Sequence, residues 1–395
     1  MNESPVPLLR RLYRAALSSV DPRRCVAAAL SEPAVAEALG RARRVGIFAV
    51  GKAAAGMFDA AAAPGRRGLV VLPRGHPAPT RRGAAVLFSA HPEPDASSVA
   101  AARAAVRFFS EFGRDDVVLS LVSGGASSLL CLPRPGVRLA QKKRAVARLV
   151  RGGAPIREVN RLRTSLSAVK GGKLGRMTAA RVVTLVLSDV AGDRPSLVGS
   201  GPTVRARRGD VTRVVGSNRL GIAGAAREAL RLGFRPRVVA RRLDGEARVA
   251  GRRLAERLLR IEPGEVLLAG GETTVSLRGP RGKGGRNLEA ALAAAIVLDG
   301  EPGLALLVAG SDGRDGSSRA AGAFVDGRTM RRARRQGVDP AAALVRHDTE
   351  PFFTRAGGLL QTGPTGTNVG DWGFGLRVHK TGHGTWDTGH EKKET

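Results

Sequence analysis

Apolar and polar positions alternate in two ways along this chain. Short continuous apolar runs, such as VGIFAVG and DVVLSLVSGG, end in glycine or an acidic residue and are typical of buried strands. Between them lie alanine-rich stretches in which apolar residues recur every three or four positions, and this spacing predicts helices. We expect strands at 45–51, 68–73, 84–90, 116–125, 182–190, 265–272 and 304–313. We expect helices at 97–112, 140–151, 218–232, 246–260 and 287–299, and a short amphipathic helix at the start of the chain.

Strands that are apolar on both faces and alternate with helices indicate a parallel sheet covered on both sides, so the fold class is α/β. A length of 395 residues predicts two domains. We place the first domain at 1–240, a connector helix at 241–263 and the second domain at 264–378. The polar, glycine-rich segment 379–395 contains three histidines, but a flexible tail is expected there rather than a metal site.

The composition excludes several classes of protein. No stretch reaches the ~18 consecutive apolar residues of a membrane span, and the first residues lack the pattern of a signal peptide. The two cysteines, Cys25 and Cys131, lie far apart, so neither a disulfide framework nor a zinc site is indicated. We expect a cytoplasmic protein.

The formal charge of +31 permits binding to nucleic acid, membrane headgroups or phosphorylated metabolites. The arginines, however, are spread along the chain in short groups, and aromatic residues make up only 4% of it. With a single tyrosine, a platform for stacking bases is hard to build. A general compositional drift explains the charge better than a nucleic-acid function, although the charge also favours anionic substrates.

Polar residues gather where the predicted strands end, which is where open α/β sheets bind ligands. The first strand ends in GKAAAG with Lys52, the fourth in SGGASS (123–128) and the fifth in SDVAGD (188–193). Later strands end in GGETT (270–274) and in AGSDGRDGSSRAAGAFVDG (309–327), and TGPTGTNVGD (362–371) follows. Glycine lets backbone N–H groups approach an anion, so SGGASS resembles an anion cradle, and GKGGRN adds Lys283 and Arg286. Anion cradles, acids and cations together are what phosphoryl transfer with magnesium requires.

Several well-known motifs are absent. The chain has no Walker A loop, no G-x-G-x-x-G fingerprint, no G-x-S-x-G elbow and no H-E-x-x-H helix. A nucleotide site here must therefore be unconventional. His76 and His91 each precede a proline, and we interpret both as structural.

The motifs as an ordered set resemble one family. GKAAAGM, HPEPDASS, VSGGASSLL, REVNRLRTSLSAVKGGKL, VLSDVAGDRPSLVGSGPT, GGETTV, GGRNLEAAL, GSDGRDGSSRAAGAFVDG and LLQTGPTGTNVGD occur in the order found in class II glycerate kinases, which include chains long labelled hydroxypyruvate reductase. The resemblance extends from about 45 to 371. It implies a kinase that uses ATP and Mg²⁺ to make 2-phosphoglycerate from D-glycerate. It also implies a Rossmann-like N-terminal domain, a smaller mixed α/β C-terminal domain and an active site in the cleft between them.

The resemblance assigns the essential lysine to Lys52 and the essential arginine to Arg286. We expect Asp189, Asp193 and Asp312 to hold magnesium, with Asp189 also a candidate for polarising the C2 hydroxyl of glycerate. The loop residues Ser123, Gly124, Gly125, Ser127 and Ser128, together with Asn160, are expected to hold a carboxylate or a phosphate. Further candidate site members are Glu272, Asn287, Thr365 and Asn368.

Structural roles remain open for some of these residues. Asp312 and Asp315 are also suited to turns and helix caps, Glu272 to an ion pair, and Thr365 and Asn368 to turns. Which acid serves as the general base is left open.

Two other functions remain alternatives. One is a hydroxypyruvate reductase that uses NADH or NADPH, and the other is a nucleic-acid-binding protein driven by charge. A kinase for another small hydroxy acid is a weaker third possibility. The expected partners are D-glycerate and ATP, with no specific nucleic acid and no membrane. The oligomeric state is open, and a homodimer is one possibility.

Overall fold

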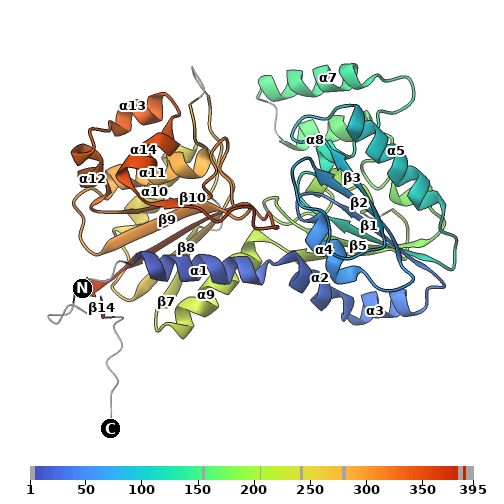
Figure 1. Ribbon diagram of the computed structural model, residues 1–395, viewed down its shortest axis with the longest axis horizontal. Helices are drawn as coiled ribbons and strands as arrows, with labels where there is room; N and C mark the ends of the chain where they lie inside the picture. The colour runs from blue at the N-terminus through green and yellow to red at the C-terminus, as the bar shows by residue number, and fades with distance from the viewer. Residues whose placement is uncertain are drawn as a thin grey trace, which may run out of the picture. The chain divides into compact units, whose positions relative to one another are not determined.

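The computed structural model describes residues 5–153, 156–204, 206–240, 243–277, 282–380 and 386–387. The chain divides into two compact units. Unit 1 consists of Met1–Val20, Asn218–Thr365 and Val369–Thr395, and unit 2 consists of Asp21–Ser217 and Gly366–Asn368. Each unit is built around one six-stranded sheet (Figure 1).

The sheet of unit 2 is parallel throughout, with strand order β3-β2-β1-β4-β5-β6. Its strands are β1 (Val45–Val50), β2 (Arg67–Pro73), β3 (Ala84–Ser89), β4 (Val117–Val122), β5 (Arg181–Leu187) and β6 (Val211–Gly216). Every residue of β4 is buried, as the continuous apolar runs predict. This is the strand order of a Rossmann-like fold, so the predicted fold class is confirmed for this unit.

Helices cover both faces of this sheet (Figure 1). The helices of unit 2 are α2 (Pro22–Leu30), α3 (Pro33–Gly40), α4 (Ala54–Ala61), α5 (Ala96–Ser110), α6 (Ala126–Leu129), α7 (Leu139–Arg151) and α8 (Ile156–Ser165), with 3₁₀ turns η1 (Gly175–Met177) and η2 (Val198–Ser200). The aromatic rings of Phe48 on β1 and Phe109 on α5 meet edge to face, with 5.3 Å between centroids. Asp95 caps the start of α5 and accepts the N–H of Ser97 at 2.8 Å.

The sheet of unit 1 is mixed, with strand order β11-β10-β9-β12-β8-β7. Its strands are β7 (Arg235–Ala240), β8 (Glu265–Gly271), β9 (Leu304–Gly310), β10 (Gly322–Asp326), β11 (Leu359–Leu360) and β12 (Asp371–Arg377). Strands β7 and β8 are parallel, whereas β12 runs antiparallel to both β8 and β9. The first residue of β12 therefore lies at the same edge of the sheet as the last residues of β8 and β9.

Unit 1 also has helices on both faces of its sheet (Figure 1). They are α1 (Val6–Ser19), α9 (Asn218–Arg231), α10 (Ala247–Leu258), α11 (Arg286–Val297), α12 (Thr329–Arg335), α13 (Pro340–Val345) and α14 (Thr349–Ala356). Tyr13 on α1 packs edge to face on Trp372, with 5.8 Å between ring centroids, and its hydroxyl donates to the carbonyl of Gly310 at 2.7 Å. Residues 287–295 of α11 are all buried, so this helix is the centre of the unit's core.

The structure divides the chain differently from the predicted boundaries at 1–240 and 264–378. The predicted first helix forms as α1, but it packs with α9 on the sheet of unit 1, and β7 pairs with β8 of the same sheet. Helix α10 lies where a connector helix is predicted, yet it buries Leu254 and Leu258 in the core of unit 1. Within 379–395, the short strands β13 (His379–Lys380) and β14 (Trp386–Asp387) pair, and the remaining residues lie outside the described part.

The longest described helix, α5, has 15 residues. None of the helices in the described ranges combines the length and apolar character needed to cross a bilayer.

The contact between α10 and α11 provides a test of the unit 1 core. A Cβ added at Gly251 would overlap the carbonyl group of Ala290, which cannot move without shifting α11. We expect Gly251→Ala to lower the unfolding free energy of unit 1 by about 1–3 kcal/mol through overpacking. The matched control is Gly40→Ala on α3, where a Cβ would meet nothing within 4 Å. Thermal unfolding followed by circular dichroism checks both, and an unchanged midpoint for Gly251→Ala would contradict this packing.

Candidate functional site

The site of unit 2 begins at the point where the order of its strands reverses. Strands β1 and β4 are neighbours, with β2 and β3 on one side and β5 and β6 on the other. The segments that follow β1 and β4 therefore leave the sheet side by side at its carboxyl edge, where folds of this type bind ligands. These segments carry Lys52 and the SGGASS loop.

Hydrogen bonds of the backbone and of the Ser123 hydroxyl join the two segments. The N–H of Lys52 donates to the carbonyl of Gly124 at 2.9 Å. The hydroxyl of Ser123 accepts the N–H of Ala53 at 3.1 Å and lies 3.3 Å from the carbonyl of Val50. Ser123 is fully buried, so its side chain fixes the geometry of the site rather than contacting a ligand.

Two glycines form the floor of this site. A Cβ at Gly124 would overlap the carboxylate of Asp189 and would lie 3.0 Å from the side-chain nitrogen of Asn368. At Gly125, whose φ is +85°, a Cβ would lie 3.1 Å from the ring of His91 and 3.6 Å from Cγ of Lys52. Only glycine allows this approach.

Some of the candidate residues lie together around these glycines, and one further residue joins them. Lys52, Asp189 and Asn368 lie together, as the candidate site requires. His91 was interpreted as structural, but the structure places it beside Gly125 in the same site. The motif HPEPDASS begins with His91 and is the sequence signal that could have identified it as a site residue.

The rest of the loop turns into α6. The hydroxyl of Ser128 donates to the carbonyl of Gly125 at 3.0 Å and stabilises the turn. Ser127 lies 3.1 Å from the hydroxyl of Ser200 and 2.7 Å from Nζ of Lys170. Asn160 accepts a hydrogen bond from Arg163 at 3.4 Å. Asp193 adopts a φ of +50° in the loop after β5.

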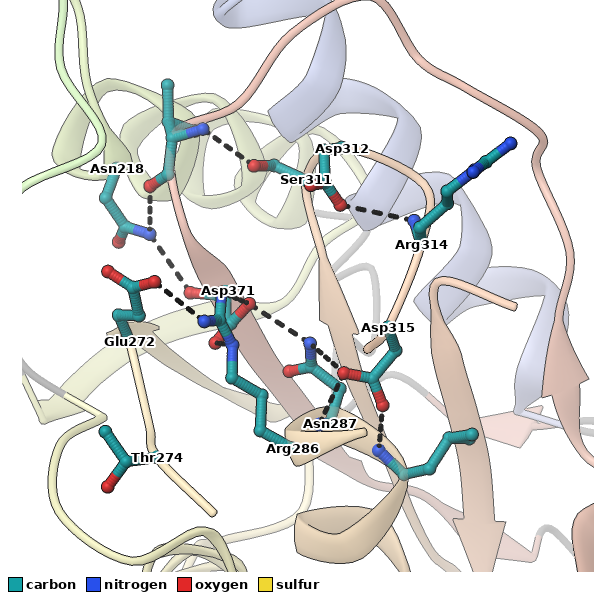
Figure 2. Close-up of polar contacts among 12 residues, drawn as sticks. Asn218, Glu272, Thr274, Arg286, Asn287, Ser311, Asp312, Arg314, Asp315 and Asp371 are labelled. Carbon is teal, nitrogen blue, oxygen red and sulfur yellow. Dashed lines mark hydrogen bonds and ion pairs between the residues drawn. The ribbon is translucent and has the colours of Figure 1, made fainter. Parts of the chain in front are cut away.

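Unit 1 holds a second polar group, centred on Arg286 at the start of α11 (Figure 2). The guanidinium lies 2.7 Å from Glu272 and 2.7 Å from Oδ2 of Asp371. A cation is unfavourable at a helix start, and these two carboxylates offset that cost. Burial alone lowers the pKa of Arg286, but Asp371 and Glu272 raise it by more, so the side chain stays charged. The ion pair considered for Glu272 is present.

Asp371 is a positioning residue that the candidate list omitted. It is the first residue of β12 and pairs in register with Gly271 on β8 and Gly310 on β9, so it lies in the middle of the sheet. Its carboxylate is 1% exposed and also accepts the side-chain N–H of Asn287 at 3.1 Å. Asn287 thus orients Asp371, which in turn orients Arg286.

Asp315 caps α11. Its carboxylate accepts the backbone N–H of Asn287 at 3.0 Å and that of Leu288 at 2.7 Å (Figure 2). Burial raises its pKa to about 7, against the two backbone donors that lower it. The capping role considered for Asp315 is therefore the one the structure shows.

Asp312 and Thr365 lie at the same edge of unit 1. Asp312 accepts the N–H of Arg314 at 3.2 Å in a tight turn, and the hydroxyl of Thr365 donates to the carbonyl of Ser311 at 2.5 Å. Ser311 in turn accepts the N–H of Val369 at 2.8 Å (Figure 2). The segment that precedes β12 is thereby pinned to the end of β9.

The described residues contain no group of three or more His, Cys, Asp or Glu side chains that could hold a metal ion. Magnesium, however, often takes only one or two carboxylates and completes its shell with substrate phosphates and water. Asp189, packed against the backbone of Gly124, provides such a carboxylate beside a possible anion cradle. The carboxylate of Asp189 therefore fits Mg²⁺ in the presence of a phosphate-bearing substrate.

Comparison with known proteins identifies the family of this chain. A family model described as a domain of unknown function (DUF4147) matches residues 8–231, and a MOFRL family model matches residues 265–371. A glycerate 2-kinase from Pyrococcus horikoshii is 35% identical over 339 residues, covering 73% of this chain and 77% of that protein. The chain belongs to the glycerate kinase family.

The fold of this glycerate kinase family member agrees with a solved structure. The crystal structure of glycerate kinase from Thermotoga maritima matches with a TM-score of 0.83 and 34% identity, covering 94% of this chain and 99% of that chain. An Agrobacterium vitis protein with the provisional name hydroxypyruvate reductase is 38% identical over 413 residues, 92% of each chain. The resemblance drawn from the motifs is confirmed.

The cap of α11 gives a pH-dependent test in this glycerate kinase family member. The folded pKa of Asp315, about 7, lies above its ordinary value of 3.8, so folding favours the protonated form. The protonated Asp315 carboxyl therefore stabilises the folded state fully below about pH 4, and this stabilisation is lost as the pH rises through 7. In Asp315→Asn, which resembles the protonated acid, we expect this loss to be absent.

Urea unfolding of both proteins between pH 5 and 8 measures the effect. The unfolding free energy of the wild type should fall relative to that of Asp315→Asn by on the order of a few kcal/mol. A difference that stays constant over this range would show that Asp315 is ionised throughout.

Proposed function

We propose that this protein is a glycerate 2-kinase that transfers the γ-phosphoryl group of ATP to the C2 hydroxyl of D-glycerate. The observation that carries the proposal is the position of Lys52, which hydrogen bonds hold against a glycine-rich loop beside Asp189 at the carboxyl edge of a Rossmann-like sheet. Relatives named glycerate 2-kinase and glycerate kinase support the same reaction.

The SGGASS loop is suited to binding phosphate. Among the described residues, the N–H groups of Gly124 and Gly125 donate to no protein acceptor, whereas Ser123 and Ala126 on either side do. Free N–H groups that point from a turn bind anionic oxygens. We assign these two groups to a phosphate of ATP, with the charge of Lys52 beside them.

Phosphoryl transfer depends mainly on positioning and on the stabilisation of charge. We assign Lys52 and Arg286 as the two cations that stabilise the charge of the transferred group. Asp189, with Asp193 in the same loop, would hold Mg²⁺, which when bound neutralises charge on the phosphate oxygens. Asp189 and His91 are the candidates for accepting the proton of the C2 hydroxyl, because both lie at the glycine floor.

The alternative of a reductase has one feature in its favour, since the strand order of unit 2 is that of dinucleotide-binding folds. The turn after β1 opposes it. That turn reads GKAAAG and places Ala53 where the dinucleotide fingerprint needs its second glycine. The cytoplasmic location, the homodimer and the absence of nucleic-acid and membrane partners remain predictions.

Site variants test the roles of the two cations. We expect Lys52→Ala and Arg286→Lys each to reduce kcat by about 10²-fold or more, because fixed charge on the transferred group is a dominant source of catalysis. Arg286→Lys keeps the charge near Asp371 but loses the two-pronged geometry of the guanidinium. The matched controls at exposed cations are Lys143→Ala for Lys52→Ala and Arg14→Lys for Arg286→Lys. Wild-type turnover in either site variant would remove that residue from the mechanism.

A side-by-side assay separates the candidate reactions. Release of ADP from ATP should depend on D-glycerate, with much lower rates for L-glycerate and hydroxypyruvate. Oxidation of NADH or NADPH on adding hydroxypyruvate is followed by absorbance in parallel. Steady oxidation without glycerate-dependent ADP release would replace the kinase with a reductase.

A further inference from the structure

Unit 2 contains a group of four cationic side chains that the site described above does not use. They are Lys142 on α7, Arg163 on α8, and Lys170 and Lys173 in the segment after α8; we call them the lysine cluster. Lys142 is 3% exposed and Lys170 is 2% exposed, whereas lysine is almost never buried without a charge partner. The buried Cys131 lies close enough to Lys142, Arg163 and Lys170 to act on them electrostatically.

The hydrogen bonds of the lysine cluster go to neutral groups only. Lys170 donates to the carbonyl and the hydroxyl of Ser127, the latter at 2.7 Å. Lys173 donates to the carbonyl groups of Thr164 at 3.0 Å and Ser167 at 2.6 Å. Within the described ranges, none of the four cations has a carboxylate partner.

The surroundings of Lys142 are the strongest argument that this cluster binds an anion. Its Nζ is buried and has no hydrogen-bond partner in the described part of the chain. It is also the buried residue of α7, where an amphipathic helix would ordinarily place an apolar side chain. Burying an unpaired ammonium group is costly, so the site is built for an anion that the protein itself does not supply.

The pKa of Lys170 agrees with this interpretation. Burial lowers it to about 7, and the positive charges of Lys142 and Arg163 add to that effect, although Cys131 opposes it. Burial likewise lowers the pKa of Lys142, with further contributions from Lys173 and Arg163. Without a ligand, Lys170 therefore releases its proton near neutral pH.

We propose that Lys142, Arg163 and Lys170 form the pocket that binds the carboxylate of the acceptor substrate, with Ser127 joining this pocket to the glycine-rich loop. The inference rests on the proposed function and adds specificity-determining residues to it. The side chains of Ser127, Asn160 and Arg163 are half-buried; Ser127 accepts from Lys170, and Arg163 donates to Asn160.

The chemistry of the cluster favours a carboxylate over a nucleotide phosphate. A phosphate bound with Mg²⁺ requires carboxylates nearby, and no acidic residue is paired with this group of cations in the described ranges. The carboxylate of glycerate carries no metal and keeps its charge throughout the reaction. A site of lysines and one arginine is suited to such a fixed anion.

The first experiment measures binding without turnover. An anion beside Lys170 raises its pKa, so D-glycerate should bind with net proton uptake at pH 8. Titration calorimetry in two buffers that differ in ionisation enthalpy measures this uptake. It should be lost in Lys170→Met, and D-glycerate should bind Lys142→Met about tenfold or more weakly, the range of a charged hydrogen bond. Binding of D-glycerate without proton uptake in the wild type would overturn the proposal.

The matched control is Lys143→Met, which changes the next residue of the same helix. Lys143 is exposed and pairs with Glu93 at 3.1 Å on the surface. In kinetics, Lys142→Met should raise the KM for D-glycerate about tenfold or more and leave the KM for ATP unchanged, while Lys143→Met changes neither. A raised KM for ATP with a normal KM for D-glycerate would assign the cluster to nucleotide binding instead.

The unfolding temperatures of the same variants show whether they fold. Methionine replaces an unpaired buried cation with an apolar chain of similar length, so the Met variants should unfold at the wild-type temperature or above it. A failure of the kinase proposal can be told apart from a failure of the carboxylate site. If the wild type binds D-glycerate with proton uptake but releases no ADP from ATP, the carboxylate site stands and the kinase reaction does not.

Discussion

The chemistry of unit 2 depends on the hydrogen bonds that join the segment after β1 to the segment after β4. The N–H of Lys52 and the buried hydroxyl of Ser123 fix these segments to each other, and the sheet fixes both to the fold. Because Gly124 and Gly125 lack side chains, Asp189, His91 and Lys52 approach the same stretch of backbone. A flexible lysine is thereby fixed at its backbone before any substrate binds, which is the preorganisation that charge stabilisation requires.

Acidic residues in this strongly basic chain serve particular arginines and helix ends. Asp371 and Glu272 hold Arg286, while Asp315 caps the helix that carries it. The lysine cluster of unit 2 is the opposite case, with buried cations and no acid in the described ranges to balance them. Arg286 is thus positioned by acids of the protein itself, whereas the charge of the lysine cluster is, in our proposal, balanced by a bound ligand.

The sequence predicted seven of the twelve strands of the two six-stranded sheets, for a physical reason. All seven predicted strands and all five internal helices are present, because buried parallel strands and amphipathic helices leave strong periodic patterns. Strands β6, β7, β10, β11 and β12 were not predicted. β7 alternates with arginine, and β12 reads DWGFGLR, where Gly373 and Gly375 make room for Leu254 and Leu258 of α10. The site was found in part through its motifs, but Lys142 was missed because a lysine in a basic amphipathic helix resembles a surface residue.

The path of the chain through unit 1 has a consequence for synthesis. Helix α1 is made first, but its packing partners, α9 and Trp372, follow some 200 and 350 residues later. Unit 2 is almost complete once residue 217 has been made, whereas the apolar face of α1 stays unburied until β12 emerges from the ribosome. Since domains fold as units during translation, the Rossmann-like unit forms first, and the nascent chain must keep α1 available until β12 arrives.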